Sequence, residues 1–485
     1  MNFRNPVLAS AVLLTILLAA SASSSVPSGL LIRNARLVDG TGAASREGFS
    51  ILVREGRIAA IGPYISAEGV QTLDASGMSV LPGLIDSHVH FVYAPGSAYR
   101  DDSGQTIREL NHQHLRAYLA CGVTTVLDAG AFTEVARDIE RWLAAGNPGP
   151  RYLTTGPYIR PPGGYGHERF GAESTPAEVE AKLNLIQSLG GAGVKIAIEK
   201  AFFNPFGGLS QFSPEMLKAI VDGAHRRGLP LYVHAMTEQA QSQAIDLGAH
   251  AIMHLAIDVP IVGSYFARPD LSEAFVARMA KSGVYQVTTL SALDTLPNLY
   301  DLRRLDDPLT QLVVPAAEIR TAREPDAPDR FAISFLGWVV PWTFEFARPP
   351  IARLLLSRDH LLAALQQGER NLLRLSRAGV PIVVGTDAPS PWPDAIYHFH
   401  GVQTAREVQL LVEAGLTPAD AIAAATRTPA RMLALDREIG TIEVGKRADL
   451  LIVRGNPLID VRALHDVAWT VAGGVARTPE EWMKQ

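Results

Sequence analysis

Hydrophobic and polar positions alternate with period two near both ends of the chain. Residues 29–81 read as short strands joined by turns, in the stretches LLIRNARLVDG, FSILVREGRIAAIGP and QTLDASGMSVLPG. The C-terminal end returns to this pattern in GTIEVGKRADLLIVRGNPL and WTVAGGVART. Such alternation is typical of strands that are buried on one face. We therefore expect residues 23–81 and 436–485 to form one small β-sandwich domain, built from both chain ends.

Between these ends, over residues 82–435, short β-branched apolar runs alternate with helix-like segments. Eight such runs occur, in the order LPGLIDSHVH, VTTVLDAG, RYLTTG, GVKIAIE, LPLYVHA, HAIMHL, VYQVTT and VPIVVGTDA. Several of the helix-like segments end at glycine, as helix C-termini often do. Alternation of this kind predicts a parallel sheet with both faces covered, and eight strands with eight helices make a TIM (β/α)8 barrel. The predicted fold class is α/β, a TIM barrel with the small β-sandwich attached.

Composition narrows the range of partners. Charged residues make up 19% of the 485 residues and the formal net charge is −5, so the basic surface that nucleic-acid binding needs is absent from the sequence. We expect a small-molecule substrate, and homo-oligomerisation stays open. The single cysteine, Cys121, excludes an intrachain disulfide and is expected to be a buried apolar residue.

The N-terminus has the three parts of a secretory signal peptide. Arg4 precedes an apolar run of about 14 residues, and Ala20-Ser21-Ala22 offers a cleavage site. The alternative is a membrane anchor, but the run is shorter than the roughly 20 residues that span a bilayer. We expect residues 1–22 to be removed and the mature chain, without a transmembrane segment, to be exported to the periplasm or the medium.

The motif His-x-His occurs three times, at residues 88 and 90, 112 and 114, and 398 and 400. His112 and His114 lie in a helix-like segment, where positions i and i+2 point in different directions, so we expect them to be surface residues. The third pair follows the last barrel strand and could contact substrate or solvent. Only His88 and His90 close a strand, where positions i and i+2 share a face and can share a metal ion.

Other ligand-type residues also stand at the ends of predicted strands. They are Lys195 in GVKIAIE, His234 in LYVHA, His254 in AIMHL and Asp387 in VVGTDA. Because a barrel brings the C-terminal ends of its strands to one face, these side chains should meet His88 and His90 at a metal site. An ammonium would repel cations, but burial lowers the pKa of a lysine, and the neutral amine can add carbon dioxide to give an anionic carbamate. The alternative for Lys195 is an ion pair inside the barrel.

Longer phrases give the chain a resemblance to a known family. They are VDG and EGRIAAIG near the start, PGLIDSHVH, and the closing EAGLTPADAIAAATRTPARMLAL and GTIEVGKRADLLIV. Over nearly the whole mature chain the sequence resembles the amidohydrolase superfamily, in its binuclear carboxylated-lysine subtype, and most of all the prolidase-like (Xaa-Pro dipeptidase and imidazolonepropionase-related) amidohydrolases. The resemblance implies two divalent metal ions with these ligands: His88, His90 and Asp387 on the first, His234 and His254 on the second, and Lys195, as N6-carboxylysine, on both. Zinc suits this ligand set best, and manganese, cobalt or iron would also fit.

The resemblance implies a hydrolase of amide bonds in small peptides or N-acyl amino acids. A hydroxide between the metals would attack the carbonyl, and Asp387 would carry the proton to the leaving amine. Hydrolysis of cyclic amides, lactones or other esters is the alternative, and phosphoesters fit less well. Deamination is disfavoured, because the deaminase branch uses a single metal whereas Lys195 is present here. A non-catalytic homologue would have lost ligands that this chain retains.

Two segments are candidates for substrate contact. The stretch PPGGYGHERFG, residues 161–171, resembles the Gly-His-Gly loop of the prolidase-like relatives with a tyrosine interposed, so it implicates His167 and Tyr165; a flexible surface loop is the alternative. Residues 291–357 form an unusually long connection with the apolar stretch FLGWVVPWTFEF at 335–346, too short to span a membrane. We expect a lid over the site, since such insertions emerge at the active-site face, or else an apolar patch for a partner.

Overall fold

The computed structural model describes residues 29–91, 107–166, 170–199, 208–257, 270–298, 301–327, 329–330, 358–389 and 398–484. The predicted signal peptide, His167 and the apolar stretch at 335–346 lie outside these ranges. No helix within them is long and apolar enough to cross a membrane.

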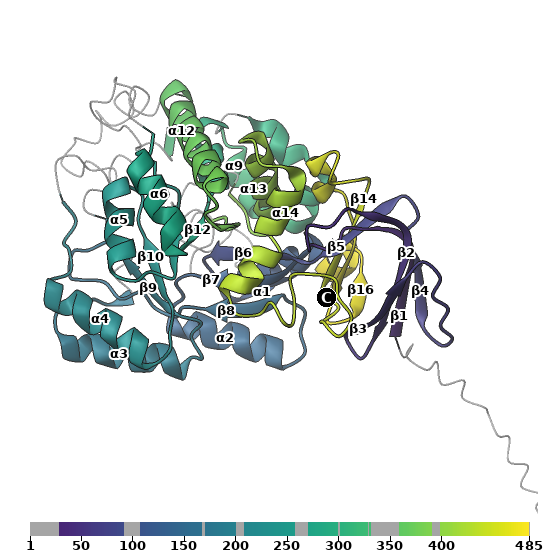
Figure 1. Ribbon diagram of the computed structural model, residues 1–485, viewed down its shortest axis with the longest axis horizontal. Coiled ribbons are helices and arrows are strands. Elements are labelled where there is room, and N and C mark those ends of the chain that lie inside the picture. The colour runs from purple at the N-terminus through teal and green to yellow at the C-terminus, as the bar shows by residue number, and fades with distance from the viewer. Residues whose placement is uncertain are drawn as a thin grey trace, which may run out of the picture.

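The two chain ends meet in one eight-stranded sheet. Its strands run in the order β16-β15-β14-β5-β1-β2-β3, with β4 paired to β1. Their bounds are β1 Gly29–Leu37, β2 Arg46–Arg54, β3 Arg57–Gly62, β4 Gln71–Asp74, β5 Met78–Pro82, β14 Leu450–Arg454, β15 Val467–Ala472 and β16 Val475–Arg477. The antiparallel pair of β5 and β14, with Val80 opposite Ile452, joins the N-terminal and C-terminal strands, which lie together at one end of the molecule (Figure 1). Alternate residues such as Leu30, Ile32 and Ile452 point into a shared hydrophobic core.

Eight further strands, one in each predicted barrel run, form two parallel sheets. The first has the order β6-β7-β8 and the second β13-β12-β11-β10-β9. Their bounds are β6 Leu84–Val89, β7 Val123–Asp128, β8 Arg151–Thr154, β9 Val194–Ala197, β10 Leu231–His234, β11 Ala251–Met253, β12 Tyr285–Val287 and β13 Ile382–Val383.

Backbone hydrogen bonds connect the edges of these two sheets on both sides. Ala192 N donates to Thr154 O at 2.7 Å, which joins the β8 edge to the β9 edge. Ser87 N donates to Val384 O at 3.0 Å, which joins β6 to the segment after β13. The strands therefore follow one another from β6 to β13 and back to β6, the order expected of an eight-stranded barrel.

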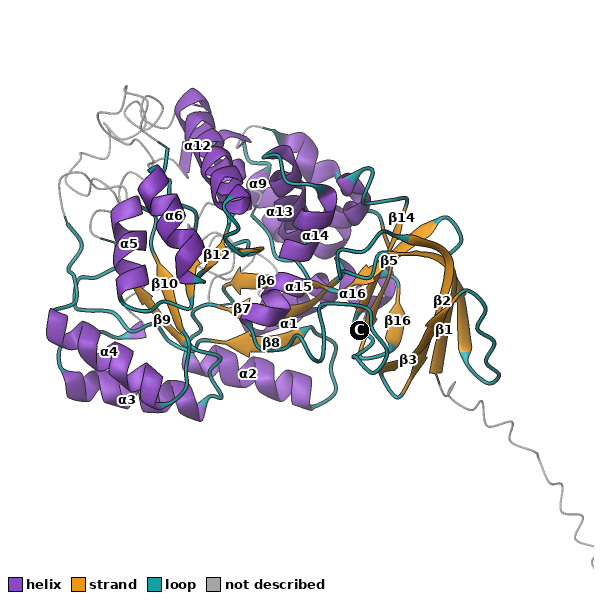
Figure 2. Ribbon diagram, in the orientation of Figure 1, coloured by secondary structure: helices purple, strands orange, loops and turns teal. Residues whose placement is uncertain are grey.

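Helices cover the outside of these strands (Figure 2). They are α1 Ile107–Ala120, α2 Thr133–Ala144, α3 Pro176–Ser188, α4 Pro214–Arg226, α5 Glu238–Asp246, α6 Glu273–Ser282, α12 Arg358–Arg377 and α13 Val402–Glu413. Local sequence sets several of their ends. Thr175 and Glu178 form a capping box at the start of α3, and Ser213 and Thr237 cap α4 and α5 through their hydroxyls. Gly283, with φ of 72°, ends α6 in the left-handed conformation that favours glycine.

The described part of the long insertion packs beside α1. It includes α8 Pro308–Val313 and α9 Ala316–Ala322, which share a hydrophobic cluster with α1 and the C-terminal α16 Pro479–Met483, whereas α7 Leu290–Thr295 packs against α12 and α13. This packing overturns the expectation that His114 is a surface residue. His114 is buried, with Nε2 3.3 Å from Oε1 of Glu318 on α9. The expectation failed because the helix that covers this face of α1 comes from a distant part of the chain.

Cys121, which follows α1, is buried, as expected of a small apolar residue. Burial raises the pKa of its thiol well above the usual range, so the nucleophilic thiolate is disfavoured. The thiol is therefore a packing group rather than a reactive one.

Candidate metal centre

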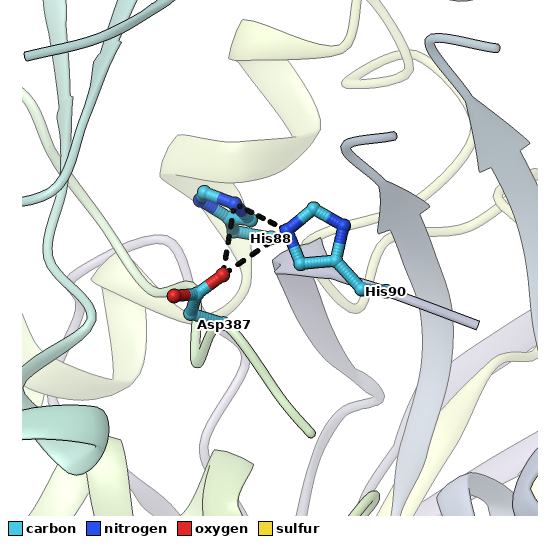
Figure 3. Close-up of side chains that lie close together, drawn as sticks. All are labelled: His88, His90 and Asp387. Carbon is cyan, nitrogen blue, oxygen red and sulfur yellow. Dashed lines mark hydrogen bonds and ion pairs between the residues drawn. The ribbon is translucent and has the colours of Figure 1, made fainter. Parts of the chain in front are cut away.

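Three potential ligands meet where β6 and β13 end. His88 and His90 leave the end of β6 on the same face, and Asp387 follows β13. His88 Nε2 lies 3.2 Å from His90 Nε2, and Asp387 Oδ1 lies 3.3 Å and 3.1 Å from these two nitrogens (Figure 3). Within the described ranges, this is the one group of three or more His, Cys, Asp or Glu residues whose ligand atoms lie mutually within 4.8 Å.

These separations suit a cation. Donors about 2.0–2.1 Å from a tetrahedral zinc ion are roughly 3.3–3.4 Å apart along each edge of the tetrahedron. The three donors are two imidazole nitrogens and one carboxylate oxygen, which is a ligand set that zinc accepts. The residues present therefore fit a divalent metal ion.

The other predicted ligands adjoin this group. Lys195 Nζ is 3.5 Å from His88 Nε2. The ring of His254 lies 4.8 Å from the ring of His88, and the ring of His234 lies 4.5 Å from that of His254. The structure thus brings the six residues from five strands into one continuous cluster at the C-terminal ends of the barrel strands.

Burial holds the imidazoles of His88, His234 and His254 neutral. It lowers the pKa of His88 and His234 well below the usual value, and the charge of Lys195 lowers the pKa of both further. Burial also lowers the pKa of His254 to about 3, although the negative charge of Asp387 opposes this shift. A neutral imidazole keeps a lone pair for a metal ion.

Lys195 and Asp387 have the charge states that the chemistry requires. Burial lowers the pKa of Lys195 to about 7, although the charge of Asp387 opposes this shift, so a substantial neutral fraction exists near neutral pH. Burial by itself would raise the pKa of Asp387, but a hydrogen bond from His90 and the interaction with the neighbouring histidines bring it down to about 2. The side chain of Asp387 is 23% exposed, so it can reach a bound molecule.

A buried carboxylate that the sequence reasoning missed orients the first group of ligands. Asp86 is fully buried, and its Oδ1 accepts hydrogen bonds from the backbone N–H of His88 at 3.3 Å and of Thr386 at 3.1 Å. Its Oδ2 accepts from the hydroxyls of Thr386 at 2.9 Å and Thr404 at 2.8 Å. One side chain thus ties the strand ends that carry His88 and Asp387. Its position two residues before His88, on the same strand face, was the available signal.

A second network orients His254. Its Nδ1 lies 3.0 Å from Oγ1 of Thr289, which leaves Nε2 for a metal ion. Thr289 has a φ of 57°, a left-handed conformation that is rare for threonine. Glu407 on α13 holds the turn, because its carboxylate accepts hydrogen bonds from the backbone N–H groups of Leu290 at 2.8 Å and Ser291 at 2.5 Å. His254 and Asp387 also have positive φ, and such strained backbone concentrates at functional sites.

Replacing Glu407 with glutamine is expected to lower the free energy of unfolding by about 1–3 kcal/mol, because an amide NH2 would face the backbone donors. Burial raises the pKa of Glu407 from 4.5 to about 7, although the hydrogen bonds from Thr288 and Ser291 oppose this shift. The folded protein therefore retains a proton that the unfolded chain releases near pH 4.5. The resulting stabilisation is complete below pH 4.5 and is lost as the pH rises through 7.

Since glutamine cannot ionise, the loss of stability in E407Q should be larger at pH 5 than at pH 8 in urea unfolding. Glu413 lies on the same helix with a side chain that is 44% exposed, so E413Q is the matched control and should change the stability by less than about 0.5 kcal/mol. An equal loss at both pH values would contradict the raised pKa.

The third His-x-His pair is buried rather than exposed to solvent. His398 Nε2 donates to the carbonyl oxygen of Thr386 at 2.9 Å, beside Asp387. His400 Nδ1 lies 2.8 Å from the hydroxyl of Tyr118, and its ring stacks on Phe91 with centroids 5.0 Å apart. Both histidines therefore pack against the segments that carry the ligands.

Two tyrosines line the centre. The ring of Tyr165 stacks on His234 at a centroid distance of 4.2 Å, which places this predicted substrate contact against a ligand. The hydroxyl of Tyr158, which the sequence reasoning missed, lies 3.5 Å from His90 Nε2. Tyr158 lies in GPYIRPPGG, four residues after the end of β8, and this place in the loop after a strand was the only available signal.

Comparison with known proteins gives consistent matches. A model described as the amidohydrolase family matches residues 79–477. A dihydroorotase from Syntrophotalea carbinolica is 27% identical over 444 residues, which cover 87% of this chain and 89% of that protein. A dihydroorotase from Streptococcus pneumoniae is 36% identical over 111 residues, so this match spans 23% of this chain and about a quarter, 24%, of the relative.

The crystal structure of a Xaa-Pro dipeptidase with bound methionine superposes with a TM-score of 0.66 at 24% identity, covering 93% of this chain and all of the other. At that identity the likeness shows the fold, a TIM barrel with an extra sheet domain. The sheets and their connecting hydrogen bonds described above agree with it.

Proposed function

The chain belongs to the amidohydrolase family, and from this premise we propose that it hydrolyses amide bonds in small peptides or N-acyl amino acids with two divalent metal ions. The observation that carries the proposal is the cluster of three donor atoms 3.1–3.3 Å apart with a buried lysine beside it. His88, His90 and Asp387 would hold one ion and His234 and His254 the other. Lys195, carboxylated by carbon dioxide, would contact both.

Bound cations of this kind polarise the scissile carbonyl and lower the pKa of an attacking water. The protein supplies the proton transfers and the positioning. The carboxylate of Asp387, ionised and partly exposed, accepts the proton of the attacking water and passes it to the nitrogen of the leaving amine. The ring of Tyr165 covers His234 and keeps bulk water from that side of the centre. Zinc is the metal that we propose, with manganese, cobalt or iron as alternatives.

The test is release of free amine from a library of dipeptides and N-acyl amino acids by protein reconstituted with zinc and bicarbonate. Release from a subset is the expected result, and the feature shared by that subset would define the pocket. Metal content is measured on the same sample. A protein that carries about two metal ions and releases no amine would contradict the proposal.

Hydrolysis of a cyclic amide is the second candidate. It is favoured by the match to the Syntrophotalea carbinolica dihydroorotase, which covers 87% of this chain. The same preparation, tested with cyclic amides and lactones, separates the two, because ring opening produces a new carboxylate without releasing a second molecule.

A further inference from the structure

The segment that follows β8 carries Arg160 on the same face as Tyr158, toward the metal centre. Ile159 forms a parallel bridge with Ile196 of β9, so the backbone is extended at this point. Side chains at positions i and i+2 of an extended segment leave on the same face. Tyr158 points at the centre, with its hydroxyl 3.5 Å from His90 Nε2. The side chain of Arg160 therefore projects from the same face of the segment, two residues nearer the mouth of the barrel.

The charge of Arg160 is buried without a carboxylate partner among the described residues. The residue is 7% exposed, and Nη2 donates to the carbonyl oxygen of Gly164 at 2.7 Å. Its Nε has no hydrogen-bond partner. The nearby acid, Glu173, forms its ion pair with Lys182 at 2.8 Å and accepts only the backbone N–H of Arg160. Burying a guanidinium without a carboxylate partner raises the free energy of the folded protein unless an anion binds to it.

The loop between these residues holds them together on one side of the centre. At Gly166, where φ is 107°, an added Cβ would lie 2.9 Å from Tyr158 Cδ2 and 3.7 Å from Arg160 Cδ. The loop therefore lies directly against both side chains, and only glycine permits this approach. Its neighbour Tyr165 stacks on His234. Tyr158, Arg160 and Tyr165 thus belong to one wall beside the ligand cluster.

We propose that Arg160 binds a carboxylate of the substrate, so that the amides hydrolysed are those that carry a free carboxylate. The proposal rests on the proposed function and deepens it. A guanidinium recognises a carboxylate with two parallel hydrogen bonds, which fixes orientation as well as charge. Dipeptides and N-acyl amino acids present such a group near the scissile bond. Neutral amides of the same size leave the guanidinium unpaired, so they are rejected.

The experiment compares N-acetyl-L-leucine with N-acetyl-L-leucinamide, which differ only in the carboxylate, by release of acetate. The reconstituted full-length protein is expected to prefer the carboxylate by at least about 100-fold in kcat/KM. R160Q should narrow this preference to within about threefold, mainly by raising KM for the carboxylate. R160K should retain an intermediate preference, because lysine keeps the charge and loses the planar fork.

The matched control is R227Q. Arg227 also donates to a backbone carbonyl, that of Gly223 at 2.9 Å, but it forms an ion pair with Glu180 on the outer helices. R227Q should keep the wild-type preference. If both substrates are hydrolysed equally by the wild-type protein, the inference is wrong, whereas the amidohydrolase activity stands.

A binding measurement decides the case in which neither compound is hydrolysed. Calorimetry on the metal-loaded D387N variant, in which turnover is expected to be strongly reduced, should give a Kd for N-acetyl-L-leucine at least about 30-fold lower than for the leucinamide. R160Q in the same background should remove the difference. Selective binding without turnover in the wild-type protein would support the role of Arg160 and contradict the proposed substrates. Equal binding of the two compounds would overturn the inference.

Discussion

Replacing Asp387 with asparagine is expected to lower kcat by at least about 10³-fold while the protein stays folded. The oxygen that asparagine retains can still lie near His88 and His90, from which Asp387 Oδ1 is separated by 3.3 Å and 3.1 Å. It cannot accept and release a proton at neutral pH, so the transfer from water to the leaving amine is lost. Steady-state kinetics on the best substrate of the library measures the effect, with circular dichroism and metal analysis on the same samples.

The control for this variant is D222N, since Asp222 is an aspartate with a 46% exposed side chain, paired with Lys218 on α4. It should retain wild-type kcat and metal content. A D387N protein with more than about a tenth of the wild-type kcat would assign the proton transfer to another group. A D387N protein that has lost its metal would instead show that the carboxylate is needed chiefly as a ligand.

The strands and the ligand cluster were accessible from sequence because both follow from local rules. Each barrel strand is a short apolar run, and a barrel brings the ends of such runs to one face whatever the loops do. His88 and His90 could therefore be paired from their spacing together with their place at a predicted strand end, and Asp387 could be added from the end of another strand. Their separations of 3.1–3.3 Å agree with that reasoning.

The groups that orient the ligands could not be found in the same way. Asp86 acts through Thr386, which is 300 residues away in the chain, and Glu407 holds a turn that precedes it by more than 100 residues. The spacing of Asp86 from His88 places it on the same strand face but does not reveal its partners, and no pattern marks Glu407, because these hydrogen bonds depend on how α13 packs against the strand ends. Arg160 was missed for a similar reason: its significance is that its buried charge has no carboxylate partner among the described residues, which only the fold reveals.

Replacing Lys195 with alanine is expected to lower bound metal from about two ions per chain to one or none and to abolish turnover. The lysine is 1% exposed and its Nζ lies 3.5 Å from His88 Nε2, so a carbamate formed on it would have no room except among the other ligands. Burial, which lowers the pKa of the amine to about 7, supplies the neutral form that reacts with carbon dioxide. Metal analysis after dialysis measures the loss, and carbon-13 NMR of wild-type protein in labelled bicarbonate detects the carbamate.

One further variant and a rescue experiment separate a bridging carbamate from an ordinary buried charge. K195R keeps a positive charge but cannot be carboxylated, so it should be as poor in metal as K195A. Short carboxylic acids such as acetate should restore part of the metal and activity of K195A, because they can occupy the space that the truncation leaves, whereas K195R has no such space. K218A, at a lysine with a 76% exposed side chain, is the control and should keep full metal. A K195A protein with full metal and full activity would refute the bridge and leave Lys195 as an ion-pair partner inside the barrel.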